Sequence, residues 1–290
     1  MKRSHVMLVG CLSLVVGMAS NCSRARVESM NKMNEGVIAA QQKRFADATK
    51  LLDSAAAIDP KNDQVFWNLA IVHMEMRKFE RARDDLQKAI AVNAEAAGYH
   101  EKLGTVLIEL KDWTGAKQAF EKAIQLEPGI FKAYYKLAQV HEQLDDQQSA
   151  LQRYTEAVQK GPRFLEAYSA LGRLYADLGY LDQATQVLQE ALKVALPGTE
   201  EEAQAHHLLG TVYQEQQKFD QAVAEFKAAL AVVPGMRDAL FSLGWTYHLL
   251  NNKEEAKRFL KRFVDVAGAE APAHYVKAAR DKLSEIQEGF

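Results

Sequence analysis

Cys22 is the residue of this chain with the clearest potential for covalent chemistry. The sequence contains two cysteines, Cys11 and Cys22, and the long segment after Cys22 contains none. A thiolate is a nucleophile that can carry a covalent group, and a lone thiol in an exported protein has no partner for a disulfide. We therefore expect Cys22 to be modified and the rest of the chain to be stabilised by packing alone. A free, unmodified Cys22 is the alternative.

The residues before Cys22 have the pattern of an export signal. Lys2 and Arg3 give the chain a positive start, and residues 6–18 contain no charged side chain. A helix that spans a bilayer needs about 20 apolar residues, so a shorter run behind early basic residues is typical of a signal peptide. We expect residues 1–21 to be removed on export, and Cys11 with them.

Two cleavage positions are compatible with this leader. The small residues at 17–19 suit an ordinary signal peptidase, whereas residues 19–22, Ala-Ser-Asn-Cys, resemble the lipobox of bacterial lipoproteins. Asn21 departs from the lipobox, which usually has Gly, Ala or Ser before the cysteine. The resemblance implies that Cys22 is acylated, that residues 22–28 form a lipidated tether, and that Ser23 after the cysteine directs the protein to the outer membrane, facing the periplasm.

The histidines and carboxylates do not form the pattern of a catalytic or metal site. His73, His141, His248 and the pair 206–207 are scattered along the chain, and adjacent histidines on a helix point to different faces. The acidic pairs and triplets suit helix starts and solvated faces. The sequence contains no Gly-rich phosphate loop, nucleophile elbow or His-Glu-x-x-His motif. We therefore expect no enzyme activity, no catalytic residue, no cofactor and no metal.

The charge balance also excludes a nucleic-acid partner. The 36 basic residues are offset by 38 acidic ones, and no Lys/Arg-rich block is present, so the chain lacks the positive patch that binds phosphates. With 48% hydrophobic residues and only 16 Gly and 6 Pro in 290, the composition favours a packed helical protein.

Alanines recur along the chain at a constant interval, which indicates an internal repeat. The interval is the same throughout except for one longer step between the fifth and the sixth, and the positions are Ala48, Ala82, Ala116, Ala150, Ala184, Ala222 and Ala256. A regular period of this length indicates stacked structural units. The sequence therefore contains seven units, with one insertion of four residues.

Most alanines lie in a common frame of aromatic, Leu, small and Pro residues. The sixth unit reads His206, Leu209, Gly210, Tyr213, Ala222, Phe226, Ala229 and Pro234. From residue 29 to about 270 this frame resembles the tetratricopeptide repeat. The resemblance implies an all-α fold, a right-handed superhelical solenoid of seven helix hairpins. Residues 271–290, with Tyr275, Ala279, Leu283 and Ile286 on one face, are expected to form a capping helix.

The residue types of the frame are explained if each unit consists of two packed helices. Small residues such as Gly104, Gly210 and Gly244 on the first helix, with alanines on the second, allow the two backbones to approach closely. Larger side chains at i, i+3, i+4 and i+7 then form the core. Prolines separate one unit from the next. Thr199 and Glu202 form a capping-box pattern, so we expect the inserted residues to start the first helix of unit six one turn early.

By this resemblance, the second, fifth, ninth and twelfth residues of each unit face a concave groove that binds other proteins. The candidate binding residues are Trp67, Ile71, Met74, Lys132, Tyr135, Gln139, Arg173, Phe241, Trp245 and His248. The alternative is that some of these side chains pack against neighbouring helices. Trp67 and Trp245 are the strongest candidates for anchors, since large aromatic side chains dominate many interfaces. Met33 and Val37 stand where co-chaperones of this family carry Lys and Asn, so chaperone docking is not expected.

Leader, cysteine and repeats together resemble the layout of bacterial outer-membrane repeat lipoproteins such as the pilotins of type IV pili. This layout implies a membrane-anchored scaffold that binds other envelope proteins or peptide segments and assists assembly of a multiprotein machine, such as a pilus secretin or a motility complex. A soluble periplasmic adaptor without lipid and a cofactor-free regulator of a peptidoglycan enzyme are the alternatives.

Overall fold

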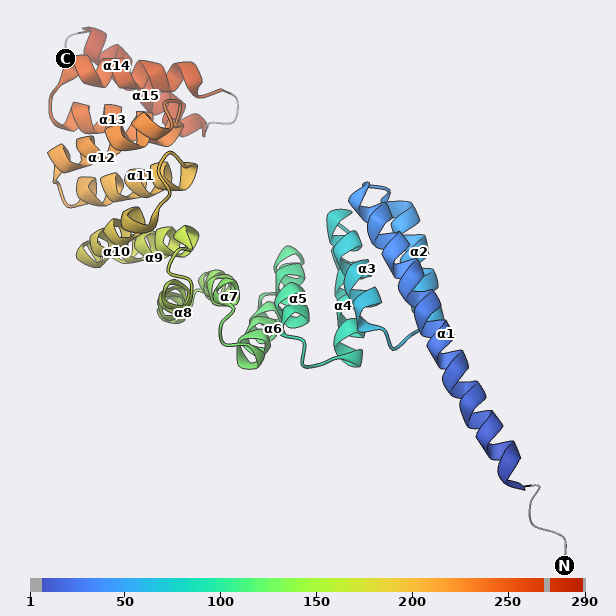
Figure 1. The fold of residues 1–290 in the computed structure, drawn as a ribbon. Helices are drawn as coiled ribbons and strands as arrows, with labels where there is room; N and C mark the ends of the chain where they lie inside the picture. The colour runs from blue at the N-terminus through green and yellow to red at the C-terminus, as the bar shows by residue number, and fades with distance from the viewer. Residues whose placement is uncertain (1–6, 269–271, 289–290) are drawn as a thin grey trace, which may run out of the picture. The chain divides into compact units, whose positions relative to one another are not determined.

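The computed structural model describes residues 7–268 and 272–288, and the side chains of residues 24–268 and 272–286. Within these residues the chain forms fifteen α-helices and no strand (Figure 1). In order they are α1 Met7–Gln41, α2 Phe45–Ile58, α3 Asp63–Glu75, α4 Phe79–Val92, α5 Ala97–Glu109, α6 Trp113–Leu126, α7 Phe131–Gln143, α8 Gln147–Lys160, α9 Leu165–Asp177, α10 Leu181–Val194, α11 Glu200–Glu215, α12 Phe219–Val232, α13 Arg237–Leu249, α14 Lys253–Val266 and α15 Ala273–Glu288.

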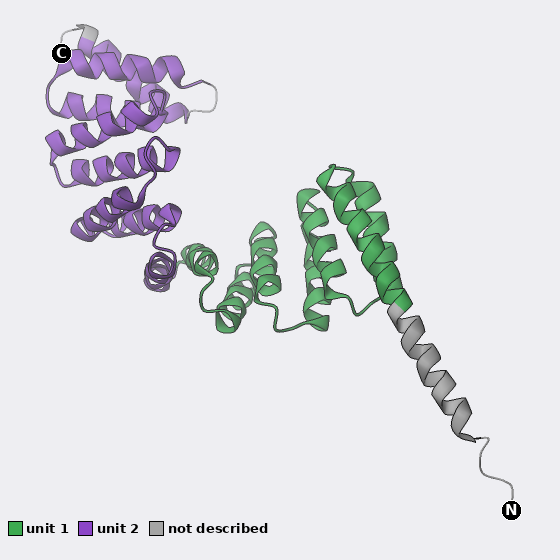
Figure 2. Cartoon of the chain, viewed as in Figure 1, with its two compact units in different colours: residues 1–145 green, residues 146–290 purple. Residues whose placement is uncertain are grey.

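The helices divide into two compact units, residues 1–145 and 146–290 (Figure 2). Within each unit, helices that follow one another in the chain pack side by side, α1 on α2 and α3 on α4 in the first unit and α11 on α12 and α13 on α14 in the second. The second helices of successive hairpins begin at residues 45, 79, 113, 147, 181, 219 and 253. These starts have the same interval as the recurrent alanines, including its one longer step, so the predicted repeat of helix hairpins is confirmed.

A left-handed residue ends the first helix of each hairpin. These residues are Lys43, Arg77, Lys111, Asp145, Gly179, Gln217 and Asn251, all with φ between 55° and 78°. The next residue closes the turn; for example, the Lys218 N–H donates to the Tyr213 carbonyl at 2.8 Å. Such a six-to-one bond is typical of a Schellman motif. The turn therefore has one geometry throughout, although glycine occurs only once at the left-handed position.

The small residues of the first helices lie directly against the second helices, as predicted. A Cβ atom placed on Gly104 would lie 2.8 Å from the ring of Phe120, and one on Gly210 would lie 2.6 Å from the ring of Phe226. Both distances are shorter than van der Waals contact. The hairpins are packed so closely that a methyl group at these positions requires the neighbouring ring to move.

The four-residue insertion extends α11 and the turn before it. This helix has 16 residues where the other first helices from α3 onward have 13, and it begins after Thr199, whose side chain accepts a hydrogen bond from the Glu202 N–H at 3.3 Å. The Glu202 carboxylate in turn accepts from the Gly198 N–H at 2.6 Å. The predicted early start is therefore confirmed, with the return bond going to Gly198 rather than to the capping residue itself.

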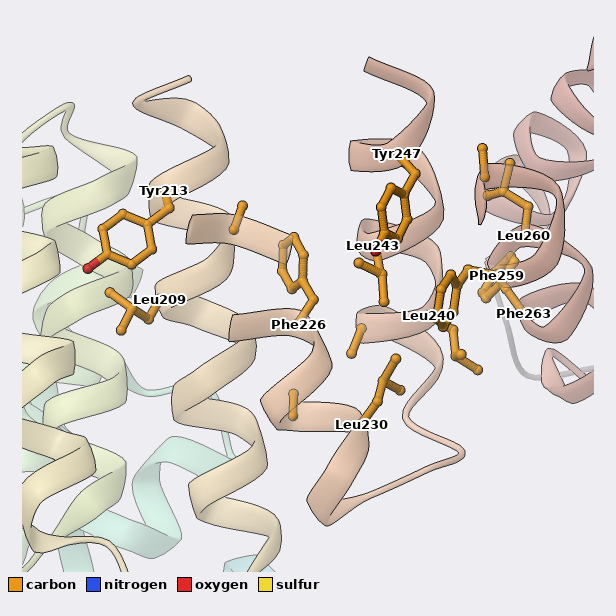
Figure 3. Packing of buried hydrophobic residues seen from close by; sticks show 14 of the residues in the cluster. Leu209, Tyr213, Phe226, Leu230, Leu240, Leu243, Tyr247, Phe259, Leu260 and Phe263 are labelled. Atoms are coloured by element: carbon orange, nitrogen blue, oxygen red, sulfur yellow. The ribbon is translucent and has the colours of Figure 1, made fainter. Parts of the chain in front are cut away.

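Both units have cores made from alanines and larger side chains between neighbouring helices. All seven recurrent alanines are fully buried. In the first unit Leu52, Leu86 and Phe120 fill the space around them. In the second unit a larger cluster runs from α10 to α15. Figure 3 shows its side chains between neighbouring helices, with Phe226 and Leu230 from α12 and Leu243 and Tyr247 from α13.

Helix α15 covers the end of the second unit, the position expected of a capping helix. Ala279 is fully buried against α14, and Val276, Leu283 and Ile286 pack on the same cluster. Tyr275, which was predicted on this apolar face, is 44% exposed and contacts α13 instead.

Helix α1 runs from the predicted leader into the first hairpin. Residues 22–28, predicted as a tether, lie within it, and at about 1.5 Å per residue they rise about 10 Å. Ser29, where the repeats were predicted to begin, is buried and donates to the Ala55 carbonyl at 2.9 Å. The Cys22 side chain lies outside the described side chains.

Candidate functional site

The predicted groove residues of α3 lie half-buried on one side of the first unit. Trp67 and Met74 pack against the cluster around Leu86, and the ring of Trp67 lies 5.1 Å from that of Tyr99 on α5. Ile71 lines a separate pocket of about 300 Å³ with Val37 of α1. Trp67 is thus fixed by an aromatic neighbour and still leaves part of its ring accessible, as an anchor for a partner requires.

The position of Tyr99 is set by a partly buried hydrogen bond to Asp63. The Tyr99 hydroxyl donates to Asp63 Oδ2 at 2.9 Å, and Asn93 donates to the same oxygen at 2.9 Å. Burial and the hydrogen bond to Asp63 raise the pKa of Tyr99 to about 12. Burial raises the pKa of Asp63, but the hydrogen bonds that its carboxylate accepts from Asn93, Tyr99 and the backbone outweigh burial and leave that pKa below its ordinary value. The phenol and the carboxylate therefore hold each other in place beside Trp67.

The α7 residues of the predicted groove form a polar group. Lys132 is exposed. Gln139 donates to the Tyr135 hydroxyl at 3.0 Å and accepts from Lys136 at 3.1 Å. The ammonium group of Lys136 also lies 5.7 Å from the centre of the Tyr135 ring. This group offers hydrogen-bonding side chains on a surface whose α3 part is apolar.

The α9 and α13 residues of the predicted groove belong to the second unit. Arg173 is exposed and forms an ion pair with Asp177 at 2.9 Å. On α13, Phe241 stacks on Trp245 with ring centroids 5.8 Å apart, and Trp245 contacts His248 at 5.7 Å. The structure therefore brings the three predicted α13 residues together as one aromatic row.

Helix α15 lies against this aromatic row. The Tyr275 ring is 4.8 Å from Phe241, and the Lys282 ammonium is 5.8 Å above the ring of Trp245. Burial and the neighbouring Lys282 lower the pKa of His248, although Glu285 opposes this. Part of the predicted α13 surface is thus occupied by the chain's own last helix, a contact that the repeat frame does not predict.

A pocket of about 890 Å³ opens beside α15, between α11 and α13. Its lining includes Gln204, His207 and Thr211 from α11, Asp238 and Phe241 from α13, and Tyr275 from α15. Three of these, Gln204, His207 and Thr211, occupy the second, fifth and ninth positions of unit six. These three residues were not among the groove residues predicted from the sequence, although the same counting rule identifies them.

His207 lies in the pocket wall. Its Nε2 atom is 3.2 Å from Ser242 Oγ, and its Nδ1 atom is buried without a hydrogen-bond partner among the described residues. Burial lowers the pKa of His207, and the nearby Asp238 opposes this only in part. The ring is therefore neutral at pH 7.

Two other histidines pair with carboxylates. His73 Nδ1 lies 2.7 Å from Asp85 Oδ2 in the core of the first unit, and His206 Nδ1 lies 2.6 Å from Glu225 Oε2 in the second. Among the described residues there is no group of three His, Cys, Asp or Glu side chains arranged to hold a metal ion. In that part of the chain, too, no helix combines the length and apolar character needed to cross a bilayer.

Comparison with known proteins identifies the repeats. One model of the tetratricopeptide repeat family matches residues 68–131, 102–162 and 207–273, and a second model of the same description matches residues 163–235. The matched segments together cover residues 68–273, which is more than half of the chain. A search of the curated proteins found no match to this sequence.

Several solved structures share the fold. The C-terminal part of a tetratricopeptide repeat protein from Cytophaga hutchinsonii aligns with a TM-score of 0.69 and 15% identity, covering 87% of this chain and 99% of that one. PilF of Pseudomonas aeruginosa aligns with a TM-score of 0.60 and 19% identity, covering 75% of this chain and 96% of that one. YrrB, a tetratricopeptide repeat protein with an unusual peptide-binding site, aligns with a TM-score of 0.54 and 24% identity, covering 65% of this chain and 95% of that one. At these identities the likeness shows the fold alone.

Proposed function

Because this chain belongs to the tetratricopeptide repeat family, whose hairpins form scaffolds for protein–protein interaction, we propose that it is an adaptor of the bacterial envelope. In this proposal Cys22 carries acyl groups that hold the protein at the outer membrane, facing the periplasm. The first helices of the hairpins then bind segments of other envelope proteins and assist assembly of a multiprotein machine.

The observation that carries the binding role is the set of large, partly accessible side chains on the first helices. The first helices present side chains of large contact area that are only half-buried, such as Trp67 and Tyr135, beside the exposed Lys132. Aromatic and long polar side chains in such positions are typical of protein-binding surfaces.

The observations that support membrane anchoring come from the sequence. Residues 1–21 have the charge and hydropathy pattern of an export signal, and Cys22 follows directly. Arg24 and Arg26 are exposed on α1, so they would lie near anionic head groups if Cys22 is acylated. Several acyl chains on one cysteine would give stable anchoring, whereas one chain alone binds reversibly.

A role in pilus assembly is a narrower form of this proposal. It is favoured by the likeness in fold to PilF of Pseudomonas aeruginosa and by the layout of leader, cysteine and repeats. Because fold alone does not specify a partner, the tests below address anchoring and binding separately from any particular machine.

Anchoring is tested by replacing Cys22→Ser and locating the protein in cell fractions, with Cys11→Ser in the leader as the matched control. We expect the Cys22 variant to leave the membrane fraction and the Cys11 variant to remain there. Mass spectrometry of the mature N-terminus should show an acylated Cys22. A Cys22→Ser protein that stays wholly in the membrane fraction would contradict the proposal, and an unmodified N-terminus would favour the soluble periplasmic adaptor.

Binding is tested by photo-crosslinking in cells. A benzophenone amino acid at Lys132, which is exposed on a first helix, is compared with one at Glu121, which is exposed on the second helix α6. We expect discrete crosslinked species with envelope proteins from position 132 and few or none from position 121. Equal crosslinking at the two positions would contradict the assignment of the first helices as the binding surface.

A further inference from the structure

The pocket between α11, α13 and α15 has an acidic rim and an aromatic wall. Glu200 and Glu201 in the first turn of α11 and Asp238 in the first turn of α13 contribute three carboxylates to its lining. All three side chains are exposed. Phe241 and Tyr275 contribute two rings in edge contact, with centroids 4.8 Å apart. The pocket thus combines negative charge with the faces and edges of aromatic rings.

The basic groups of the lining do not neutralise these carboxylates. The Arg237 side chain is directed to the end of α14, where Nη1 donates to the Ala267 carbonyl at 3.3 Å. The His207 ring is held neutral by its burial, which lowers its pKa. With three carboxylates and one guanidinium, the lining carries a clear excess of negative charge at pH 7.

All three carboxylates stand in the first turn of their helices. Acidic residues in the first turn stabilise a helix through its dipole, and Glu202 serves this role by accepting from the Gly198 N–H. Glu200 and Glu201 add two more charges at the same helix end, and Asp238 adds a third from another helix on the same pocket. Bringing like charges together is unfavourable, so a cationic ligand would relieve the repulsion.

The same surface already binds one cation from within the chain. Lys282 of α15 places its ammonium group 5.8 Å above the ring of Trp245, which stacks on Phe241. A cation over an aromatic face is attracted by the ring quadrupole. The pocket continues this aromatic row toward α11, with Phe241 and Tyr275 in its lining.

We propose that this pocket binds an arginine or lysine side chain of a partner polypeptide, with Glu200, Glu201 and Asp238 pairing with the charge and Phe241 and Tyr275 contacting its aliphatic stem. The inference rests on the proposed binding of protein segments, and it adds the class of side chain that the second unit selects. An arginine fits the arrangement well, because a guanidinium stacks on rings and bridges two carboxylates. Apolar residues on either side of it would contact the rest of the aromatic row.

The test uses the purified full chain and two fluorescein-labelled heptapeptide amides, Gly-Ala-Leu-Arg-Leu-Ala-Gly and the same peptide with neutral citrulline in place of arginine. Fluorescence anisotropy should show binding of the arginine peptide and at least about tenfold weaker binding of the citrulline peptide, which corresponds to about 1.4 kcal/mol. The triple variant Glu200→Gln, Glu201→Gln, Asp238→Asn should lose this preference. Raising the salt concentration should weaken binding of the arginine peptide to the wild type, since exposed charges are screened.

The matched control is the double variant Glu254→Gln, Glu255→Gln. These two residues stand in the first turn of α14, as Glu200 and Glu201 do in α11, but they do not line the pocket. The control should retain the wild-type preference for arginine, and circular dichroism should show that both variants keep their helix content. Equal affinity of the wild type for the two peptides, no binding of either, or a triple variant with an unchanged preference would each overturn the inference.

The result of this peptide-binding test is independent of the results of the crosslinking and fractionation experiments. If position 132 crosslinks to envelope proteins while the arginine peptide is not preferred, the adaptor role stands and the assignment of the pocket is wrong. If the arginine peptide is preferred while Cys22→Ser leaves the membrane association unchanged, the pocket stands and the lipid anchor is wrong.

Discussion

The Tyr275 ring of α15 lies edge-on against the Phe241 ring of α13, with the centroids 4.8 Å apart and the planes at 65°. Such T-shaped contacts between aromatic rings are favourable by about 0.5–1.5 kcal/mol beyond the burial of area. Phe241 also contacts Phe263 of α14. One first-helix residue of the last hairpin therefore joins three helices, and the end of the repeat array is closed by aromatic contacts as well as by aliphatic ones.

Disrupting the α14–α15 interface should detach α15. Ala279 is fully buried there, so Ala279→Asp places a charge in an apolar contact at a cost of several kcal/mol unless the helix moves away. We expect Trp245 emission to shift to longer wavelength in this variant, since Lys282 no longer covers its ring. Ser284→Asp, which adds the same charge at an exposed position of α15, is the control. Identical emission spectra for the two variants would contradict this docking.

The buried pair of His73 and Asp85 should stabilise the first unit only while both partners are present. Their side chains are each 7% exposed, and His73 Nδ1 lies 2.7 Å from Asp85 Oδ2. Asp85→Ala leaves a buried imidazole without this partner and should lower the free energy of unfolding by about 2–4 kcal/mol.

The next hairpin supplies the rescue variant for this pair. At the positions that correspond to His73 and Asp85, one repeat later, it has the buried residues Leu107 and Ala119. The double variant His73→Leu, Asp85→Ala should therefore recover much of the stability lost in Asp85→Ala, because it replaces a polar pair by an apolar pair that this fold already accommodates. Urea denaturation measures the free energy of unfolding of both variants. A double variant less stable than Asp85→Ala would show that the pair is not exchangeable.

The arrangement of helices could be predicted from the sequence because it follows from the period. The seven alanines at that period are all fully buried, and the small residues of the first helices lie where the frame requires close approach. Helix α15 lies outside the period, so the sequence predicted its apolar face but not its contact with Trp245. For the same reason, counting positions within the repeat identifies Gln204, His207 and Thr211 as groove residues. It does not identify Tyr275, which lines the same pocket but stands outside the repeats.

The left-handed turns were also beyond sequence reasoning at most positions. Lys43, Arg77, Lys111 and Gln217 carry no turn signal, yet each adopts a positive φ in a turn that local backbone hydrogen bonds close. A residue other than glycine costs about 1–2 kcal/mol in this conformation. Gln217→Gly should therefore raise the free energy of unfolding by about 0.5–1 kcal/mol, after allowance for the entropy of glycine in the unfolded chain.

The reverse substitution is the control for the turn. Gly179→Ala introduces a Cβ at φ 78° with open space around it, so any loss of stability reports the backbone conformation alone. We expect a loss of about 1 kcal/mol. Thermal or urea denaturation should show that Gln217→Gly raises the stability and Gly179→Ala lowers it. Changes in stability of the same sign would contradict the conformational explanation.

Two glycines of α5 allow the close approach of helices to be tested within one helix. Gly104→Ala would place a Cβ 2.8 Å from the Phe120 ring and should destabilise the protein by about 1–3 kcal/mol through overpacking. Gly98→Ala meets nothing within 4 Å, so it should stabilise the protein by up to about 1 kcal/mol, because alanine is the better helix former. Equal effects of the two substitutions on the urea midpoint would show that the hairpin tolerates bulk at residue 104.

The burial of Tyr99 and its hydrogen bond to Asp63 should make the stability of the first unit depend on pH in the alkaline range. The pKa of Tyr99 is about 12 in the folded protein and about 10 in the unfolded chain. A raised pKa means that the folded state keeps its proton longer, so the stabilisation is complete below pH 10 and is lost as the pH rises from 10 to 12. Tyr99→Phe should remove this component of the pH dependence.

Absorbance of phenolate at 295 nm measures the titration directly, as the difference between the wild type and Tyr99→Phe. Asp63→Asn should lower the pKa of Tyr99 from about 12, but not fully to 10, because burial is the larger cause of the shift and the carboxylate the smaller one. Since Tyr99 supports the ring of Trp67, the Asp63 variant should also alter Trp67 fluorescence. A Tyr99 that titrates near pH 10 in the wild type would contradict the hydrogen bond and remove the support proposed for this part of the groove.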